Sequence, residues 1–189
     1  MLITLILLGV SAFLLTLPAA QTFLAKKAVA YLNKEYDIDI DIERIHVKIN
    51  GYVDIKRVLL RDHKQDTLIS AKELNTSILS IDQLIEGNLF FGSITADSLI
   101  LNMKTHKGDT LSNLDVFVNK FDSGEPSTGS FIMKAKKIKL KNSKVEIIDE
   151  NNANPSTLKV DRLNATVKDF KILGSKIFLT LEDSNFRFD

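Results

Sequence analysis

The sequence predicts a mainly β protein in which an N-terminal transmembrane helix precedes a curved sheet with short capping helices. Three observations carry this prediction. The first 25 residues are apolar and free of charge. The apolar period then changes from 3.6 to 2 at about residue 37. Beyond that point, pairs of alternating apolar residues recur with a gap of three between them, which is typical of bent strands.

Residues 1–25 are predicted to form the membrane anchor. They contain none of the 25 basic and 24 acidic side chains of this 189-residue chain. Crossing about 30 Å of hydrocarbon takes roughly 20 apolar residues, which this segment supplies. The anchor candidates within it are Leu2, Leu7, Leu14 and Leu17. A cleaved secretory signal that ends in Leu17-Pro18-Ala19-Ala20 is the alternative, although a proline before the cut fits the cleavage rule poorly.

Residues 26–36 are predicted to continue as an amphipathic helix. Apolar residues recur at spacings of three and four from the end of the anchor into this segment, with the charged residues mostly elsewhere: Phe23, Leu24, Ala28, Tyr31, Leu32 and Tyr36. Two interpretations stay open at this point. The helix lies along a membrane surface, or it packs over the end of the domain that follows.

Strands begin where Asp37 to Ile42 alternate strictly between Asp and Ile, which places the isoleucines on one face and leaves the aspartates in solvent. Apolar residues then recur at i, i+2, i+5 and i+7: Ile40, Ile42, Ile45 and Val47; Val53, Ile55, Val58 and Leu60; Ile94, Ala96, Leu99 and Leu101; Leu158, Val160, Leu163 and Ala165. A looser form, with a gap of five, holds Ile138, Leu140, Val145 and Ile147.

The gap of three would move half of each strand to the other face unless a bulge or a tight hairpin intervenes. The residues in the gaps, such as Glu43-Arg44 and Asp161-Arg162, offer neither the Gly nor the Asn that a tight hairpin prefers. Bulges in bent strands are therefore favoured. Repeated bends that keep one face apolar predict a strongly curved sheet.

Two short helices are expected between the strands, one capped by Ser80 and one by Ser112. Residues 122–130 alone have the composition of a linker. They separate a first β segment, residues 37–121, from a second, residues 131–189.

The sequence predicts no catalytic, metal or cofactor site. The chain has no cysteine, and its net charge of +1 provides no basic field for nucleic acid. His46, His63 and His106 stand singly, without a second ligand at metal-binding spacing. The lysines between residues 134 and 144 form one strand face, which is either a solvated outer surface or a site for anionic headgroups.

Several segments together carry a family resemblance: the single anchor, the strand that begins Ile38-x-Ile40, Val58-Leu59-Leu60-Arg61-Asp62, Ala71-Lys72-Glu73-Leu74, Glu86-Gly87-Asn88-Leu89 and Ile94-x-Ala96-x-Ser98-Leu99-x-Leu101. This succession resembles the N-terminal part of the AsmA-like superfamily, and within it the TamB family in the form found in Bacteroidetes-type bacteria. The shared motifs are patterns of apolar spacing and include no catalytic signature.

The resemblance implies a single-pass inner-membrane protein whose bulk lies in the periplasm as a taco-like β-groove. It implies transport of phospholipid between the inner and outer membranes, or assembly of outer-membrane proteins, and no enzymatic activity. It also implies that the chain continues into a longer protein, whose missing region meets a BamA/TamA-like barrel. The residues expected to line the groove are Ile38, Ile40, Ile42, Ile45, Val47, Ile94, Leu99, Leu101, Ile138, Leu140, Val145 and Ile147.

Overall fold

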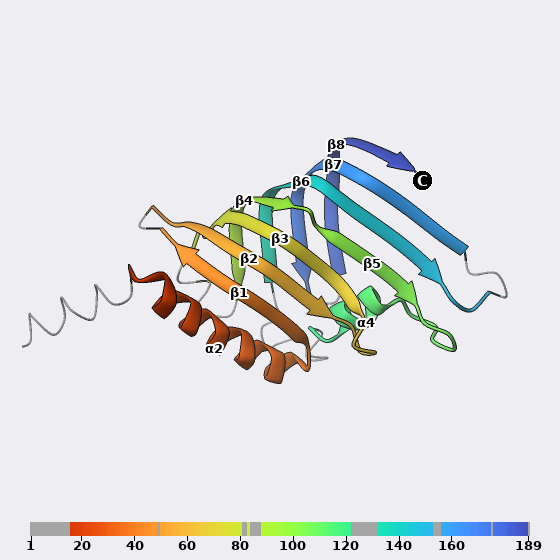
Figure 1. Ribbon diagram of the computed structural model, residues 1–189, viewed down its shortest axis with the longest axis horizontal. Coiled ribbons are helices and arrows are strands. Elements are labelled where there is room, and N and C mark those ends of the chain that lie inside the picture. Colours follow the sequence, from red (N-terminus) through yellow and green to blue (C-terminus); the bar gives the residue numbers. More distant parts are fainter. Residues whose placement is uncertain are drawn as a thin grey trace, which may run out of the picture.

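The computed structural model describes residues 16–48, 50–80, 83, 88–121, 132–152, 156–174 and 176–188, and it is mainly β (Figure 1). Two helices and eight strands lie in these ranges. They are α2 (Pro18–Tyr36), β1 (Asp39–Val47), β2 (Tyr52–Arg61), β3 (Thr67–Ser77), β4 (Leu89–Asp97), β5 (Ile100–Thr105), α4 (Asn113–Asn119), β6 (Ile132–Asp149), β7 (Ser156–Leu173) and β8 (Lys176–Phe188).

All eight strands belong to one sheet. β1, β2 and β3 pair in antiparallel order, and β6, β7 and β8 do the same. Between the two groups, β4 and β5 follow each other along a single line. Both pair antiparallel with β3 on one side and parallel with β6 on the other. The two predicted segments, residues 37–121 and 131–189, therefore share one sheet.

The predicted bends are present, and left-handed residues make them. Arg57, Ser98, Asn142 and Arg162 have φ values of 48°, 53°, 48° and 52°. In β2 and β7 the strand continues through this residue, as bending requires and a hairpin would not allow. Bent strands rather than hairpins are therefore confirmed, but the predicted bulges are only partly present. The register shifts at the bends of β6 and β7, between Leu140 and Ser143 and between Asp161 and Asn164, whereas β1 and β2 keep their register past Arg57.

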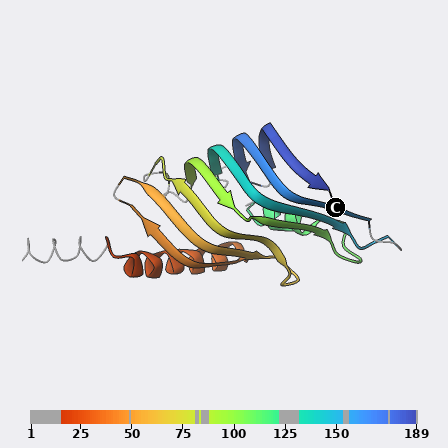
Figure 2. The same ribbon diagram turned by 45° about the horizontal axis from the view of Figure 1, so that its top comes forward.

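These left-handed residues form a crease that runs across the strands. Ile42 lies opposite Val58 and Arg44 opposite Lys56, so Arg57 faces Glu43. β4 and β5 share one register with β6, which places Ser98 opposite Asn142. Because each bend lies beside the next, the sheet bends along a line, as Figure 2 shows.

The two helices lie below this curved sheet, α2 along β1 and α4 inside the curve (Figures 1 and 2). The core cluster forms where they meet the sheet. Ile38, Phe121 and Ile172 are its buried members, and Tyr36 and Phe117 pack against them. The apolar face of the sheet is therefore the concave face.

The Ser112 cap is confirmed. Its hydroxyl accepts a hydrogen bond from the Asp115 N–H, and the Asp115 carboxylate accepts one from the Ser112 N–H, which forms a capping box. Most of the helix expected after Ser80, and the whole of the expected linker 122–130, lie outside the described residues.

The N-terminal predictions have a mixed outcome. α2 begins at Pro18, so the expected boundary between residues 25 and 26 falls inside one helix. Leu2, Leu7 and Leu14 lie outside the described residues, and Leu17 is the N-cap residue of α2. From residue 16 onward, no described helix is both long and apolar enough to cross a bilayer.

Candidate functional site

The candidate site is the concave apolar face of the sheet, and its side chains are aligned in rows across the strands. Residues directly opposite in neighbouring strands share a face. One row runs from β1 to β7 through Ile40, Leu60, Ile69, Leu101, Val145 and Val160. A second, on the other side of the crease, runs through Ile45, Ile55, Leu74, Ala96, Leu140 and Ala165.

The remaining groove candidates join these rows. Ile42 and Val47 each lie two residues from a row member in β1, as Leu99 and Ile147 do near β5 and in β6. Ile94 lies opposite Ile138 and two residues from Ala96. Ile38 differs from the rest, because it precedes β1 and belongs to the core cluster beside α4.

This face is continuous but incompletely covered. Ile38 and Ile42 are buried, with 9% and 6% of their surface exposed, whereas Val47 and Ile147 reach 36% and 38%. The other eight candidates are half-buried. An ordinary core would bury such residues almost completely.

The opposite face carries the charge. Lys139, Lys141 and Lys144 on β6 are exposed, while their neighbours Leu140 and Val145 are half-buried. Ion pairs join adjacent strands on the same outer side, among them Lys56–Glu73 at 2.5 Å and Lys159–Glu146 at 2.9 Å. A solvated outer surface, one of the two interpretations of this lysine face, agrees with this arrangement.

One strand of the concave face, β3, was not among those predicted from the sequence to line it. In β3, Ile69, Ala71, Leu74 and Thr76 repeat the i, i+2, i+5, i+7 spacing and lie opposite apolar residues of β2. The repeat ends in a threonine, which hides the pattern. Thr76 is 6% exposed, and its Oγ1 is buried without a hydrogen-bond partner among the described residues.

An apolar hollow of about 370 Å³ opens beside β4, β6 and β7. Leu79, Phe90, Phe91 and Phe170 line it. At its rim, the Lys134 ammonium lies 4.7 Å from the centroid of the Phe90 ring. Aromatic rings beside a cation offer a surface for an apolar group that carries a negative charge.

Polar side chains of α2 cover the free edge of β1. Asn33 Nδ2 donates to the Ile40 carbonyl at 2.8 Å, and the Ile40 N–H donates to Asn33 Oδ1 at 3.0 Å. The Thr22 hydroxyl exchanges two such bonds with Ile45, each of 3.1 Å. Gln21 forms the same pair with Val47, at 2.9 and 2.8 Å. These bonds occupy edge groups that would otherwise pair with another strand.

The other edge of the sheet differs. In the part of the chain that the structure describes, no strand pairs with the outer side of β8. Its apolar side chains are exposed as well: Ile177 at 38%, Phe178 at 49%, Leu179 at 55% and Leu181 at 56%.

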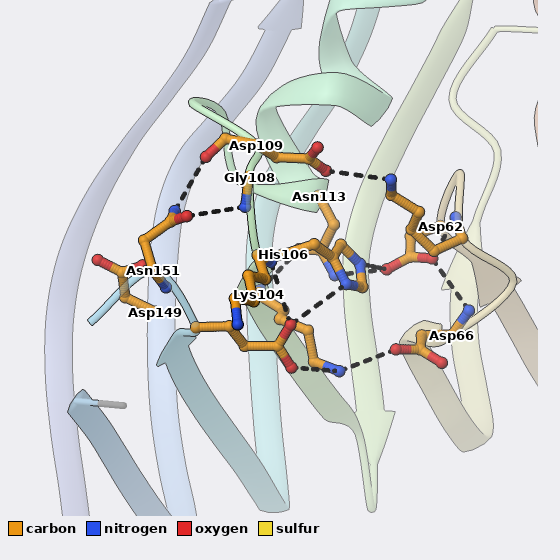
Figure 3. A network of polar contacts seen from close by, with 12 residues as sticks. Asp62, Asp66, Lys104, His106, Gly108, Asp109, Asn113, Asp149 and Asn151 are labelled. Carbon is orange, nitrogen blue, oxygen red and sulfur yellow. Dashed lines mark hydrogen bonds and ion pairs between the residues drawn. The ribbon is translucent and has the colours of Figure 1, made fainter. Parts of the chain in front are cut away.

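A polar network closes one end of the face and fixes α4 there (Figure 3). The Asp62 side chain is fully buried. Its Oδ1 accepts from the N–H groups of Lys64 at 2.8 Å and Asp66 at 3.0 Å. Its Oδ2 accepts from Asn113 Nδ2 at 2.9 Å and lies 2.9 Å from His106 Nε2. Asp62 thus joins the β2–β3 turn to the start of α4.

The network shifts the acid–base equilibria of its members. Burial by itself raises the pKa of Asp62, but hydrogen bonds from Asn113, His106 and two backbone N–H groups lower it, and the net direction is down. The hydrogen bond to Asp66 raises the pKa of Lys104, with a further contribution from Glu150.

The expectation that the histidines stand singly is wrong for two of them. The rings of His63 and His106 lie 5.4 Å apart, edge to face, and His63 Nε2 is 3.1 Å from Asp109 Oδ2. Ligand atoms of Asp62, Asp66 and His106 also lie within 4.8 Å of one another. The four hydrogen bonds of Asp62 account for this grouping as a structural joint, because they occupy both of its oxygens.

A comparison with protein-family models and one with curated proteins each find no match.

Proposed function

We propose that this chain is a membrane-anchored periplasmic β-groove protein of the TamB/AsmA type. It carries phospholipid between the inner and outer membranes and so supports outer-membrane biogenesis. The observation that carries the proposal is the concave face, which is apolar across every strand from β1 to β7 and remains only partly covered.

The dimensions of this face suit an acyl chain. From β1 to β7 a row crosses five strand spacings, and at about 4.8 Å each it measures about 24 Å. One leaflet of a bilayer core is about 15 Å thick, so a row is long enough for a whole acyl tail. Each fully buried methylene contributes about 0.8 kcal/mol relative to water, so about 8 kcal/mol is the upper limit for a tail of ten carbons lying along a row.

The proposal places residues 1–25 in the inner membrane and the sheet in the periplasm. Its support is the charge-free composition of that segment. A BamA/TamA-like barrel in the outer membrane is the proposed partner. Alkaline carbonate extraction tests the anchor, and release of an intact protein that begins near Gln21 would identify the segment as a signal peptide.

Photo-crosslinking tests the groove. A benzoylphenylalanine at position 147 replaces an apolar side chain that is 38% exposed on the inner face, so the larger residue fits without repacking. The matched position is Lys139 on the same strand, which is exposed on the outer face. We expect phospholipid adducts, detected by mass spectrometry, at position 147 and none at position 139.

A second pair of variants links lipid to function. Leu101→Glu puts a charge into the first row, whereas Leu101→Ala leaves the row apolar. At equal protein levels, we expect cells with the Glu variant to become sensitive to vancomycin and cells with the Ala variant to stay resistant. A Glu variant that accumulates normally, yields no lipid adducts and still sustains the outer membrane would refute lipid transport.

The uncovered edge of β8 favours a second candidate function, an assembly scaffold for outer-membrane proteins. Its unpaired backbone and exposed apolar side chains suit the addition of a client strand. A crosslinker at position 179 distinguishes the two functions. Protein adducts at position 179 without lipid adducts at position 147 would favour the scaffold function over lipid transport.

A further inference from the structure

α2 presents two different faces, and only one of them contacts the sheet. Gln21, Thr22 and Asn33 bond to β1, and Leu32 and Tyr36 pack against the core cluster. The opposite face carries Phe23, Lys27, Tyr31 and Lys34, which recur at spacings of four, four and three. Packing against the sheet therefore accounts for the residue types on one face of α2 but not for those on the opposite face.

The outward face exposes large apolar and aromatic side chains between its lysines, where solvent contact would favour polar residues. Phe23 is 61% exposed, Leu24 51% and Tyr31 64%. The Lys27 ammonium lies 5.7 Å from the centroid of the Phe23 ring. Aromatic rings interleaved with lysines are typical of helices at the boundary between water and lipid.

The charge of this helix is complementary to an anionic surface. Lys26, Lys27 and Lys34 stand against a single acidic residue, Glu35. None of the three lysines forms an ion pair with a described carboxylate. The helix begins inside the charge-free stretch of the chain, because residues 18–25 belong to both.

We propose that the outward face of α2 lies flat in the headgroup region of an anionic bilayer, with its axis parallel to the membrane plane. Because β1 runs along the other side of α2, the sheet then stands on the membrane with β1 nearest and β8 farthest (Figure 1). β8 lies about 29 Å beyond β1, at six strand spacings of about 4.8 Å. The rows of the concave face thus run away from the bilayer, with their Ile40 and Ile45 ends next to it.

This inference rests on the proposed membrane anchor but makes a separate claim about orientation. It confines the membrane crossing to residues 1–17 and moves residues 18–25, which belong to α2, into the headgroup region. A helix that instead left the bilayer at a right angle would carry residue 31 about 12 Å farther out than residue 23. The apolar parts of both side chains would then not reach lipid together.

Depth-dependent quenching tests the orientation. The chain has no tryptophan, so Phe23→Trp and Tyr31→Trp each introduce a single reporter into these 189 residues. Leu181→Trp on β8 is the matched control, because Leu181 is exposed to a similar extent, 56%, at the far edge of the sheet. The probe is a vesicle of phosphatidylethanolamine and phosphatidylglycerol, with or without brominated acyl chains.

We expect the tryptophans at positions 23 and 31 to lose about half of their fluorescence in brominated vesicles, as side chains seated 5–10 Å into the interface would. The tryptophan at position 181 should keep its fluorescence. Quenching at position 23 alone would overturn the flat orientation, and quenching at neither helix position in vesicle-bound protein would overturn the membrane contact of this face. Protein that does not float with the vesicles at all would refute the anchor in the proposed function together with this inference.

Discussion

The side chains of α2 that cover the β1 edge lead to a sharp prediction, because each supplies both a donor and an acceptor to one strand residue. Asn33→Ala removes two bonds to Ile40, of 2.8 and 3.0 Å. Each bond contributes about 0.5–1.5 kcal/mol net, so the free energy of unfolding should fall by about 1–3 kcal/mol. Alanine is a good helix former, so α2 itself is not weakened.

Asn33→Ala should change the exchange rate of an individual amide as well as the free energy of unfolding. In the wild-type protein the Ile40 N–H donates to Asn33 Oδ1, so we expect this amide to be protected from exchange although it belongs to an edge strand. In Asn33→Ala it loses its acceptor, and its exchange with deuterium should accelerate about 10- to 100-fold, since 1.4 kcal/mol corresponds to a factor of ten. Thr22→Val keeps the shape of its side chain and should produce the same acceleration at Ile45.

Urea denaturation and amide exchange by NMR measure the two effects, with Lys34→Ala as the control on the adjacent helix position. Lys34 lies on the outward face, so Lys34→Ala should change the free energy of unfolding by less than about 0.5 kcal/mol. If the Ile40 amide exchanges equally fast in the wild type and in Asn33→Ala, α2 does not protect the edge, and the reasoning fails.

Three further outcomes are expected. Leu140→Asp puts a charge on the inner face and should cost about 2–4 kcal/mol of stability, while Lys139→Asp on the outer face should cost less than about 0.5 kcal/mol; equal losses in thermal unfolding would show that the faces are misassigned. Asp62→Ala leaves four donors without an acceptor and should cost about 3–5 kcal/mol in urea denaturation. Since the pKa of Asp62 is lowered in the folded state, its carboxylate stabilises the protein above its unfolded-state pKa of 3.8, and an acid titration should show that contribution lost as the pH falls below this value, which Asp62→Ala should not show. Asn142→Val puts a β-branched residue at a φ of 48° and should cost about 1–2 kcal/mol, whereas Asn142→Gly should change stability by less than about 0.5 kcal/mol; an equal cost for both would mean that the crease does not depend on this conformation.

The features that the sequence predicted well are those set by residues close together in the chain. The Asp-Ile alternation defines β1, and the gap of three between apolar pairs marks the bends at Arg57, Ser98 and Arg162. The cap at Ser112 is also a local signal.

The features that it missed depend on which strands become neighbours. His63 and His106 are 43 residues apart and meet only because β2 and β5 flank β3. The parallel pairing of β4 and β5 with β6 has no counterpart in local spacing. On α2, Gln21, Thr22 and Asn33 read as the polar side of an amphipathic helix, and only the exposed edge of β1 reveals their function.

The crease explains how a sheet can stay curved without filling its concave face. A sheet that bends through side-chain packing collapses when its inner side chains are small or absent. Here the bend lies in the backbone, at residues held in the left-handed conformation, and ion pairs such as Lys56–Glu73 and Lys159–Glu146 join neighbouring strands from the outer side. The inner side chains are therefore not needed to maintain the shape of the sheet, and the rows can remain half-exposed, as Ile40, Leu101 and Leu140 are. Curvature set by the backbone and an apolar face left partly open are the two conditions that a groove for acyl chains requires, and each follows from a different set of residues in the same i, i+2, i+5, i+7 repeat.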